Sequence, residues 1–206
     1  MLEAAGVAVF ALTGALVAVR KGMDPFGFIL LATVTGVGGG TLRDLLLGRI
    51  VFWVRDPSDV LVCAGVALAA WALAYARPGM LDGWAGKRLL IWGDAAGLAL
   101  FAVAGTLKAL DVGVSPLSAV ALGAMTATFG GILRDILAGD RPMVLWSRDF
   151  YVTAAAAGAG ATALLASFGV DPAVVMLGGL ITGFGLRAGS IMFGWSFPGL
   201  PPQAKD

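Results

Sequence analysis

The sequence has 206 residues, of which 59% are hydrophobic and 13% are charged, and its mean hydropathy is +0.90. This balance excludes a soluble globular domain and is typical of an integral membrane protein. The net charge is +1 and the basic residues are scattered, so no nucleic-acid partner is expected. The chain has no histidine and a single cysteine, Cys63, which excludes an intramolecular disulfide and a metal site built from those residues.

Apolar segments long enough to cross a bilayer, which takes about 20 residues, follow one another along the chain. There are seven: 2–19, 25–47, 58–76, 89–110, 115–138, 149–168 and 172–193. Pro25, Pro116 and Pro172 stand at the start of three of them, where a helix tolerates the missing N–H. The connectors are too short for a soluble domain, so we expect an all-α integral membrane protein with one membrane domain, 1–206.

The second half of the chain repeats the first at an offset of 91 residues. Residues 39–44 (Gly-Gly-Thr-Leu-Arg-Asp) correspond to residues 130–135 (Gly-Gly-Ile-Leu-Arg-Asp), and Glu3 corresponds to Asp94. Because each copy holds three spans, an odd number, the second copy should enter the bilayer from the opposite side. The predicted parts are a first three-helix repeat, a second, inverted repeat, a seventh helix and a C-terminal tail, at 1–88, 89–170, 171–195 and 196–206.

Basic residues in the loops predict the orientation in a cell inner (plasma) membrane. One side receives eight and the other three: Arg20, Lys21, Arg77, Lys87, Arg88, Arg141, Arg148 and Lys205 against Arg49, Arg55 and Lys108. The more basic side should be cytoplasmic, which places the N-terminus outside and the C-terminus in the cytoplasm.

Glycines cluster inside the second and fifth spans: Gly36, Gly38, Gly39, Gly40, Gly130 and Gly131. Each glycine in a helix interior costs about 1 kcal/mol relative to alanine, so we expect both helices to be broken there. The backbone groups freed by a break need a buried or water-lined site, which favours a permeation pathway at the repeat interface. For any single glycine, close helix packing on small residues is the alternative explanation.

An arginine and an aspartate follow each glycine cluster: Arg43 and Asp44 in the second span, Arg134 and Asp135 in the fifth. Neighbouring helix positions point about 100° apart, so each arginine should pair with an acid from another helix and not with the adjacent aspartate. Depth along the spans matches Arg43 with Glu3 near the outer surface and Arg134 with Asp94 near the inner surface. Snorkelling to the lipid headgroups is the alternative for these side chains.

Two further basic residues lie within the spans. Lys108, near the end of the fourth span, is interpreted as an interfacial anchor, and Arg187, in the seventh, as a snorkelling residue. Either could instead line a pore or move in the membrane field.

The two glycine and Arg-Asp motifs, at 39–44 and 130–135 of a seven-span chain, resemble those of the prokaryotic trimeric intracellular cation (TRIC) channels. The resemblance covers essentially the whole chain. It implies a homotrimer whose protomers each contain a potassium-permeable pore, with second and fifth helices kinked at the glycines. In animal members, basic residues of the fourth helix are tied to voltage response, and only Lys108 could match them here. The same repeat domain is associated with glycine transport in some bacterial relatives.

We therefore expect a homotrimeric channel for monovalent cations, mainly potassium, with sodium as another permeant ion, membrane lipids as partners and no cofactor. The arginines would hold the broken helices in place. Cations would be attracted by four carboxylates, those of Asp44, Asp135, Asp94 and Glu3. A secondary transporter of glycine or another small amino acid is the competing hypothesis, because the same helix breaks could bind the carboxylate and the ammonium group of the amino acid. An enzyme is not expected, because the sequence has no nucleophile with an accompanying base. A structural scaffold is the weakest hypothesis, because it does not explain why charges are placed in the bilayer.

Overall fold

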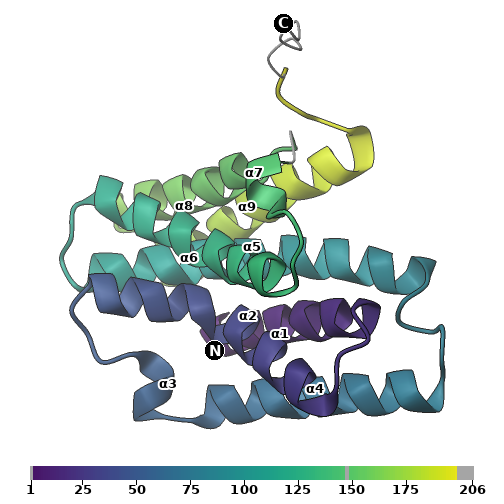
Figure 1. Cartoon of the computed structure of the whole chain (residues 1–206). Helices are drawn as coiled ribbons and strands as arrows, with labels where there is room; N and C mark the ends of the chain where they lie inside the picture. The colour runs from purple at the N-terminus through teal and green to yellow at the C-terminus, as the bar shows by residue number, and fades with distance from the viewer. Residues whose placement is uncertain (1, 147–148, 199–206) are drawn as a thin grey trace, which may run out of the picture.

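The structure is a computed structural model that describes residues 2–146 and 149–198 (Figure 1). In that part of the chain all regular secondary structure is helical, apart from one isolated β-bridge between Asp149 and Ser196. The helices are α1 (Leu2–Arg20), α2 (Pro25–Leu46), α3 (Phe52–Arg55), α4 (Ser58–Ala76), α5 (Trp84–Asp111), α6 (Pro116–Leu137), α7 (Met143–Trp146), α8 (Val152–Ser167) and α9 (Pro172–Phe193).

The predicted membrane spans correspond to seven of these helices. Six of them, α1, α2, α4, α5, α6 and α9, are long and apolar enough to cross a bilayer. The sixth predicted span, 149–168, becomes α8, which has only 16 residues because its helix begins at Val152. The short helices α3 and α7, of four residues each, were not predicted. Arg148, Lys205 and most of the predicted tail lie outside the described residues.

The two halves of the chain repeat each other in local structure, with α1 to α4 corresponding in order to α5 to α8. Asp24 and Ser115, which are 91 residues apart, both cap the following helix by accepting a backbone N–H with their side chains. Gly22 and Gly113, also 91 apart, both take a positive φ, of 61° and 85°, in the loop before that cap. The helix α9 has no counterpart in the first half.

Equivalent helices of the two halves run antiparallel. In α1 and α5, Phe10 lies against Gly97, whereas the earlier Gly6 lies against the later Phe101. The Phe10 and Phe101 rings have centroids 5.2 Å apart and lie in the buried core. Because later positions of one helix meet earlier positions of the other, the helices point in opposite directions, as an inverted pair of repeats requires.

The helix breaks predicted at the glycines are absent from the described structure. Both α2 and α6 are continuous through Gly36–Gly40 and through Gly130 and Gly131. A Cβ atom added at Gly39 would lie 2.0 Å from the carbonyl oxygen of Thr126, and one at Gly130 would lie 2.4 Å from that of Thr35. These two glycines therefore allow α2 and α6 to cross in backbone contact, which corrects the predicted breaks in favour of close packing.

We predict that Gly39→Ala and Gly130→Ala each lower the thermal unfolding midpoint of the detergent-purified protein. The added methyl group must displace a backbone carbonyl, and overpacking typically costs about 1–3 kcal/mol. As controls, Gly65→Ala and Gly185→Ala add a Cβ where no atom lies within 4 Å. They should leave the midpoint unchanged or raise it slightly, and equal loss in all four variants would contradict the packing explanation.

Candidate functional site

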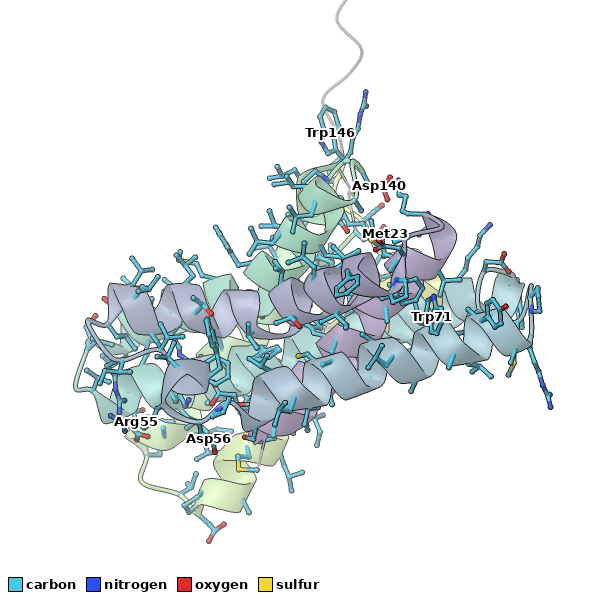
Figure 2. All side chains as sticks on the ribbon, turned by 60° about the horizontal axis from the view of Figure 1, so that its bottom comes forward. Met23, Arg55, Asp56, Trp71, Asp140 and Trp146 are labelled. Carbon is cyan, nitrogen blue, oxygen red and sulfur yellow. The ribbon has the colours of Figure 1, made fainter. Side chains whose placement is uncertain are left out.

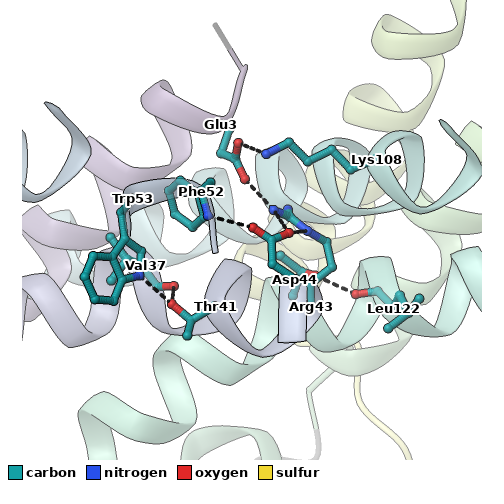
Figure 3. A network of polar contacts seen from close by, with 10 residues as sticks. Glu3, Val37, Thr41, Arg43, Asp44, Phe52, Trp53, Lys108 and Leu122 are labelled. Atoms are coloured by element: carbon teal, nitrogen blue, oxygen red, sulfur yellow. Dashed lines mark hydrogen bonds and ion pairs between the residues drawn. The ribbon is translucent and has the colours of Figure 1, made fainter. Parts of the chain in front are cut away.

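The first polar cluster, named here the Arg43 cluster, consists of Glu3, Arg43, Asp44 and Lys108 (Figure 3). Arg43 is buried, and its Nη2 donates to Oε1 of Glu3 at 2.8 Å while its Nε donates to Oδ1 of Asp44 at 2.8 Å. The ammonium group of Lys108 pairs with the other oxygen of Glu3. Two acids and two bases from α1, α2 and α5 thus form one connected and electrically balanced group.

The second polar cluster, the Arg134 cluster, consists of Thr13, Asp94, Arg134 and Asp135. Nη1 of the buried Arg134 donates to Oδ1 of Asp94 at 3.0 Å and to the Thr13 hydroxyl at 3.1 Å. Its Nε donates to Oδ1 of Asp135 at 2.9 Å. Three helices, α1, α5 and α6, meet at this arginine.

Both predicted pairs are present, Arg43 with Glu3 and Arg134 with Asp94. The prediction that an arginine cannot pair with the aspartate next to it was wrong. The Cβ atoms of neighbouring residues diverge, but the long arginine side chain folds back. Nε of Arg43 therefore reaches Asp44, and Nε of Arg134 reaches Asp135. Each buried guanidinium therefore contacts two carboxylates, which lowers the cost of burying its charge.

Each of these aspartates also holds the start of a short helix. Oδ2 of Asp44 accepts the N–H of Phe52, where α3 begins, at 3.0 Å. Oδ2 of Asp135 accepts the N–H of Met143, where α7 begins, at 3.0 Å. Phe52 and Met143 are also 91 residues apart, so the repeat could have identified both contacts if the loops had been aligned.

The two remaining basic residues do not lie as predicted. Lys108 is part of the Arg43 cluster, with its side chain 34% exposed, and is not simply an interfacial anchor. Arg187 is 1% exposed, its guanidinium lies 4.9 Å from the centroid of the Tyr151 ring, and its Nη1 lies 3.7 Å from Oδ2 of Asp149. The prediction that Arg187 snorkels was wrong, because the buried ring of Tyr151, the residue just before α8, provides a partner for its guanidinium inside the protein.

A pocket adjoins each cluster. The Asp44 pocket has a volume of about 160 Å³ and the Asp135 pocket one of about 270 Å³. They are lined at five equivalent positions: Asp44, Arg49, Ile50, Phe52 and Lys108 in one, Asp135, Asp140, Arg141, Met143 and Val17 in the other. Asp44 and Asp135 lie near the C-terminal ends of α2 and α6. Since α2 and α6 run antiparallel, the two pockets lie toward opposite ends of the bundle.

Between the pockets, the described residues are closely packed. Thr35 and Thr126 meet Gly130 and Gly39 at the crossing of α2 and α6, and the Phe10 ring lies 3.0 Å from a Cβ added at Gly130. Both threonine hydroxyls donate to carbonyls of their own helix, those of Leu31 and Leu122, at 2.6 Å. This layer of glycine, threonine and phenylalanine separates the two pockets.

Known proteins resemble the chain over most of its length. A family model described as "Glycine transporter" matches residues 1–75 and 91–167, in two segments that follow the internal repeat. A UPF0126 membrane protein of Vibrio cholerae is 39% identical over 199 residues, which cover 96% of this chain and 81% of that protein. The UPF0126 membrane protein YvgT of Bacillus subtilis is 35% identical over 96% of this chain and 94% of its own.

A solved structure of the TRIC trimeric intracellular cation channel orthologue from Rhodobacter sphaeroides has a TM-score of 0.87 to this chain. It is 47% identical in sequence and covers 94% of this chain and 97% of its own. The chain belongs to the TRIC channel family. A second solved structure, described as the structural basis for conductance through TRIC cation channels, has a TM-score of 0.86 to this TRIC chain. It is 30% identical in sequence and covers 99% of this chain and 98% of its own.

Membership in the TRIC family agrees with the geometry. The TRIC chain is an all-helical membrane protein, and its relatives include the UPF0126 inner membrane protein YadS of Escherichia coli, 43% identical over 74% of this chain and 72% of its own. The close match to TRIC cation channels supports a cation channel.

We predict that Arg134→Met destabilises the TRIC chain by about 3–5 kcal/mol, because it leaves two buried carboxylates, Asp94 and Asp135, without their cation. Lys108→Met is the matched control: it also removes a base from a cluster, but Glu3 keeps Arg43 and the lost pair is partly solvent-exposed, so about 1 kcal/mol or less is expected. Thermal unfolding of both variants in the same detergent measures the difference. Equal unfolding midpoints would contradict the expectation that Arg134 contributes more to stability than Lys108.

Proposed function

We propose that this TRIC chain is a potassium-permeable channel for monovalent cations, and that it assembles as a homotrimer with one pore in each protomer. The match to structures of TRIC cation channels supports cations as the transported ions, and the trimer is inferred from the trimeric orthologue. Within this chain, the observation that most supports a pore is the pair of symmetry-related pockets on opposite sides of the α2 and α6 crossing.

In this proposal the pathway begins in the Asp44 pocket, passes the crossing of α2 and α6, and ends in the Asp135 pocket. Each pocket contains an aspartate that can attract a cation. The buried arginines add little net positive charge, because Arg43 shares the carboxylates of Glu3 and Asp44 with Lys108, and Arg134 contacts those of Asp94 and Asp135. Orientation follows the loop charges, with the Asp44 pocket outside and the Asp135 pocket facing the cytoplasm.

The narrow part would lie at the glycine and threonine layer. Since the hydroxyls of Thr35 and Thr126 donate their protons to helix carbonyls, their lone pairs remain available to a dehydrated cation. The layer is closed in the described structure, so conduction requires α2 and α6 to separate there. Gly39 and Gly130, which hold the helices in backbone contact, are the positions where such a shift changes the width most directly.

We predict potassium currents when the purified protein is reconstituted in a planar bilayer with a potassium gradient. Unitary currents should reverse at the potassium equilibrium potential, because passive flow through a pore follows the gradient of the permeant ion. Thr35→Val combined with Thr126→Val should lower the conductance while leaving the fold intact, since both hydroxyls bond only to their own helices. The control, Thr182→Val in α9, should conduct normally.

A secondary transporter of glycine is the second candidate function. It is favoured by the description of the matching family model and by the mixture of acidic and basic side chains in each pocket, which could hold both ends of a zwitterion. Saturable counterflow of labelled glycine in liposomes, together with silence in the bilayer, would replace the channel by the transporter.

A further inference from the structure

One position in the pocket linings carries opposite charges in the two halves of the chain. Arg49 lines the Asp44 pocket, and Asp140, which lies 91 residues later, lines the Asp135 pocket. Figure 2 labels Asp140 and Arg55, another residue of the Asp44 pocket, and the two lie well apart in that view. The pockets therefore present opposite charges at this shared position.

The backbone places both residues in the same way. Gly48 and Gly139 take a positive φ, of 64° and 71°, just after α2 and α6 end. The next residue, Arg49 or Asp140, donates its N–H to the carbonyl of the aspartate five positions earlier, at 2.9 Å or 2.8 Å. Both helices thus end in a Schellman motif. Because the two turns are equivalent, the difference between the pockets at this position is one of side-chain charge and not of backbone structure.

The other charged residues of the two linings are similar. Each lining contains the aspartate that contacts a buried arginine, Asp44 or Asp135. Arg134, which also lines the Asp135 pocket, is held by Asp94 and Asp135. Each lining has two further bases, Arg55 and Lys108 in the Asp44 pocket and Arg20 and Arg141 in the Asp135 pocket. The shared position is therefore where the two linings differ most in charge.

A lysine partly compensates the charge of Asp140. Nζ of Lys21, in the loop between α1 and α2, pairs with Oδ1 of Asp140 at 2.5 Å. The two side chains are 32% and 37% exposed, so water and ions compete with this pair. The residue equivalent to Lys21 in the second half is Val112, and Arg49 forms no ion pair within the described part of the chain. The charge of Asp140 is thus screened by a neighbour, whereas that of Arg49 is not.

We propose that Arg49 and Asp140 set a preferred direction of cation flow, and that Lys21 limits this preference by pairing with Asp140. The preference rests on the proposed channel function and orientation. A fixed charge at a pore mouth changes the local concentration of the permeant ion. Asp140 concentrates potassium at the cytoplasmic pocket, whereas Arg49 depletes it at the outer pocket. At equal and opposite voltages, outward potassium flow therefore exceeds inward flow.

The first test records unitary currents in inside-out patches from giant spheroplasts that express the protein, where its orientation is native. Potassium chloride is equal on both sides, and spheroplasts without the protein give the baseline. Outward current should exceed inward current about 1.5- to 3-fold at about 0.1 M, where the Debye length is about 10 Å. The two currents should become nearly equal at about 1 M, where the Debye length is about 3 Å.

Single variants assign this ratio of currents to the proposed residues. Arg49→Gln and Asp140→Asn should each lower the ratio of outward to inward current. Lys21→Gln should raise it, and a gain of this kind is not expected from damage to the fold. Lys87→Gln removes an exposed base of α5 that lines neither pocket, so this matched control should leave the ratio unchanged.

The second test measures the charge of each pocket without any current. The purified Ile50→Cys and Arg141→Cys proteins react with a cationic and an anionic thiosulfonate of similar size, and the two rates are compared. Adding Arg49→Gln should raise the cationic-to-anionic rate ratio at position 50 about two- to fivefold. Adding Asp140→Asn should lower the ratio at position 141 by a similar factor. A purely structural effect would change both rates alike and leave the ratio unchanged.

The outcomes separate this proposal from the proposed function. Equal currents or a larger inward current in the unmodified protein at about 0.1 M would overturn the direction preference and leave the channel in place. Rate ratios that Arg49→Gln and Asp140→Asn do not change would overturn it as well. Absence of current from the unmodified protein and from every variant would instead contradict the proposed channel, and with it the direction preference.

Discussion

The structure depends on two buried arginines, each held between two carboxylates. Arg43 and Arg134 are both 1% exposed, and a guanidinium at that depth is tolerated only when its charge is compensated. Each arginine contacts one acid from a neighbouring long helix and one from its own helix, and the latter also fixes a short helix. The same contacts thus join three elements in each half, and the aspartates of these contacts, Asp44 and Asp135, line the two pockets.

The crossing of α2 and α6 links the two halves. Gly39 and Gly130 occupy equivalent positions, and each meets the backbone carbonyl of a threonine on the opposite helix. Because a protein interior has little free volume, a small shift of one helix against the other changes the whole layer between the pockets. In the channel proposed above, this layer is where the pathway would open and close.

The sequence predicted the long-range part of the site better than the local part. The offset of 91 residues and the depth of each charge were sufficient to match Glu3 with Arg43 and Asp94 with Arg134. The glycines were misinterpreted because helix propensity describes an isolated helix, whereas the carbonyls that exclude a side chain belong to the partner helix. The buried position of Arg187 depends on Tyr151, which no helical periodicity relates to it, so its environment could not be read from the sequence.

The central claim is that the two pockets are equivalent sites facing opposite sides of the membrane. Ile50 and Arg141 are exposed, 91 residues apart, and line the Asp44 and Asp135 pockets. The most direct measurement introduces Ile50→Cys or Arg141→Cys and adds an impermeant maleimide to intact cells and to inside-out vesicles; the native Cys63 is fully buried. We predict labelling of position 50 only in cells and of position 141 only in vesicles. Labelling of both positions from the same side would contradict the inverted arrangement.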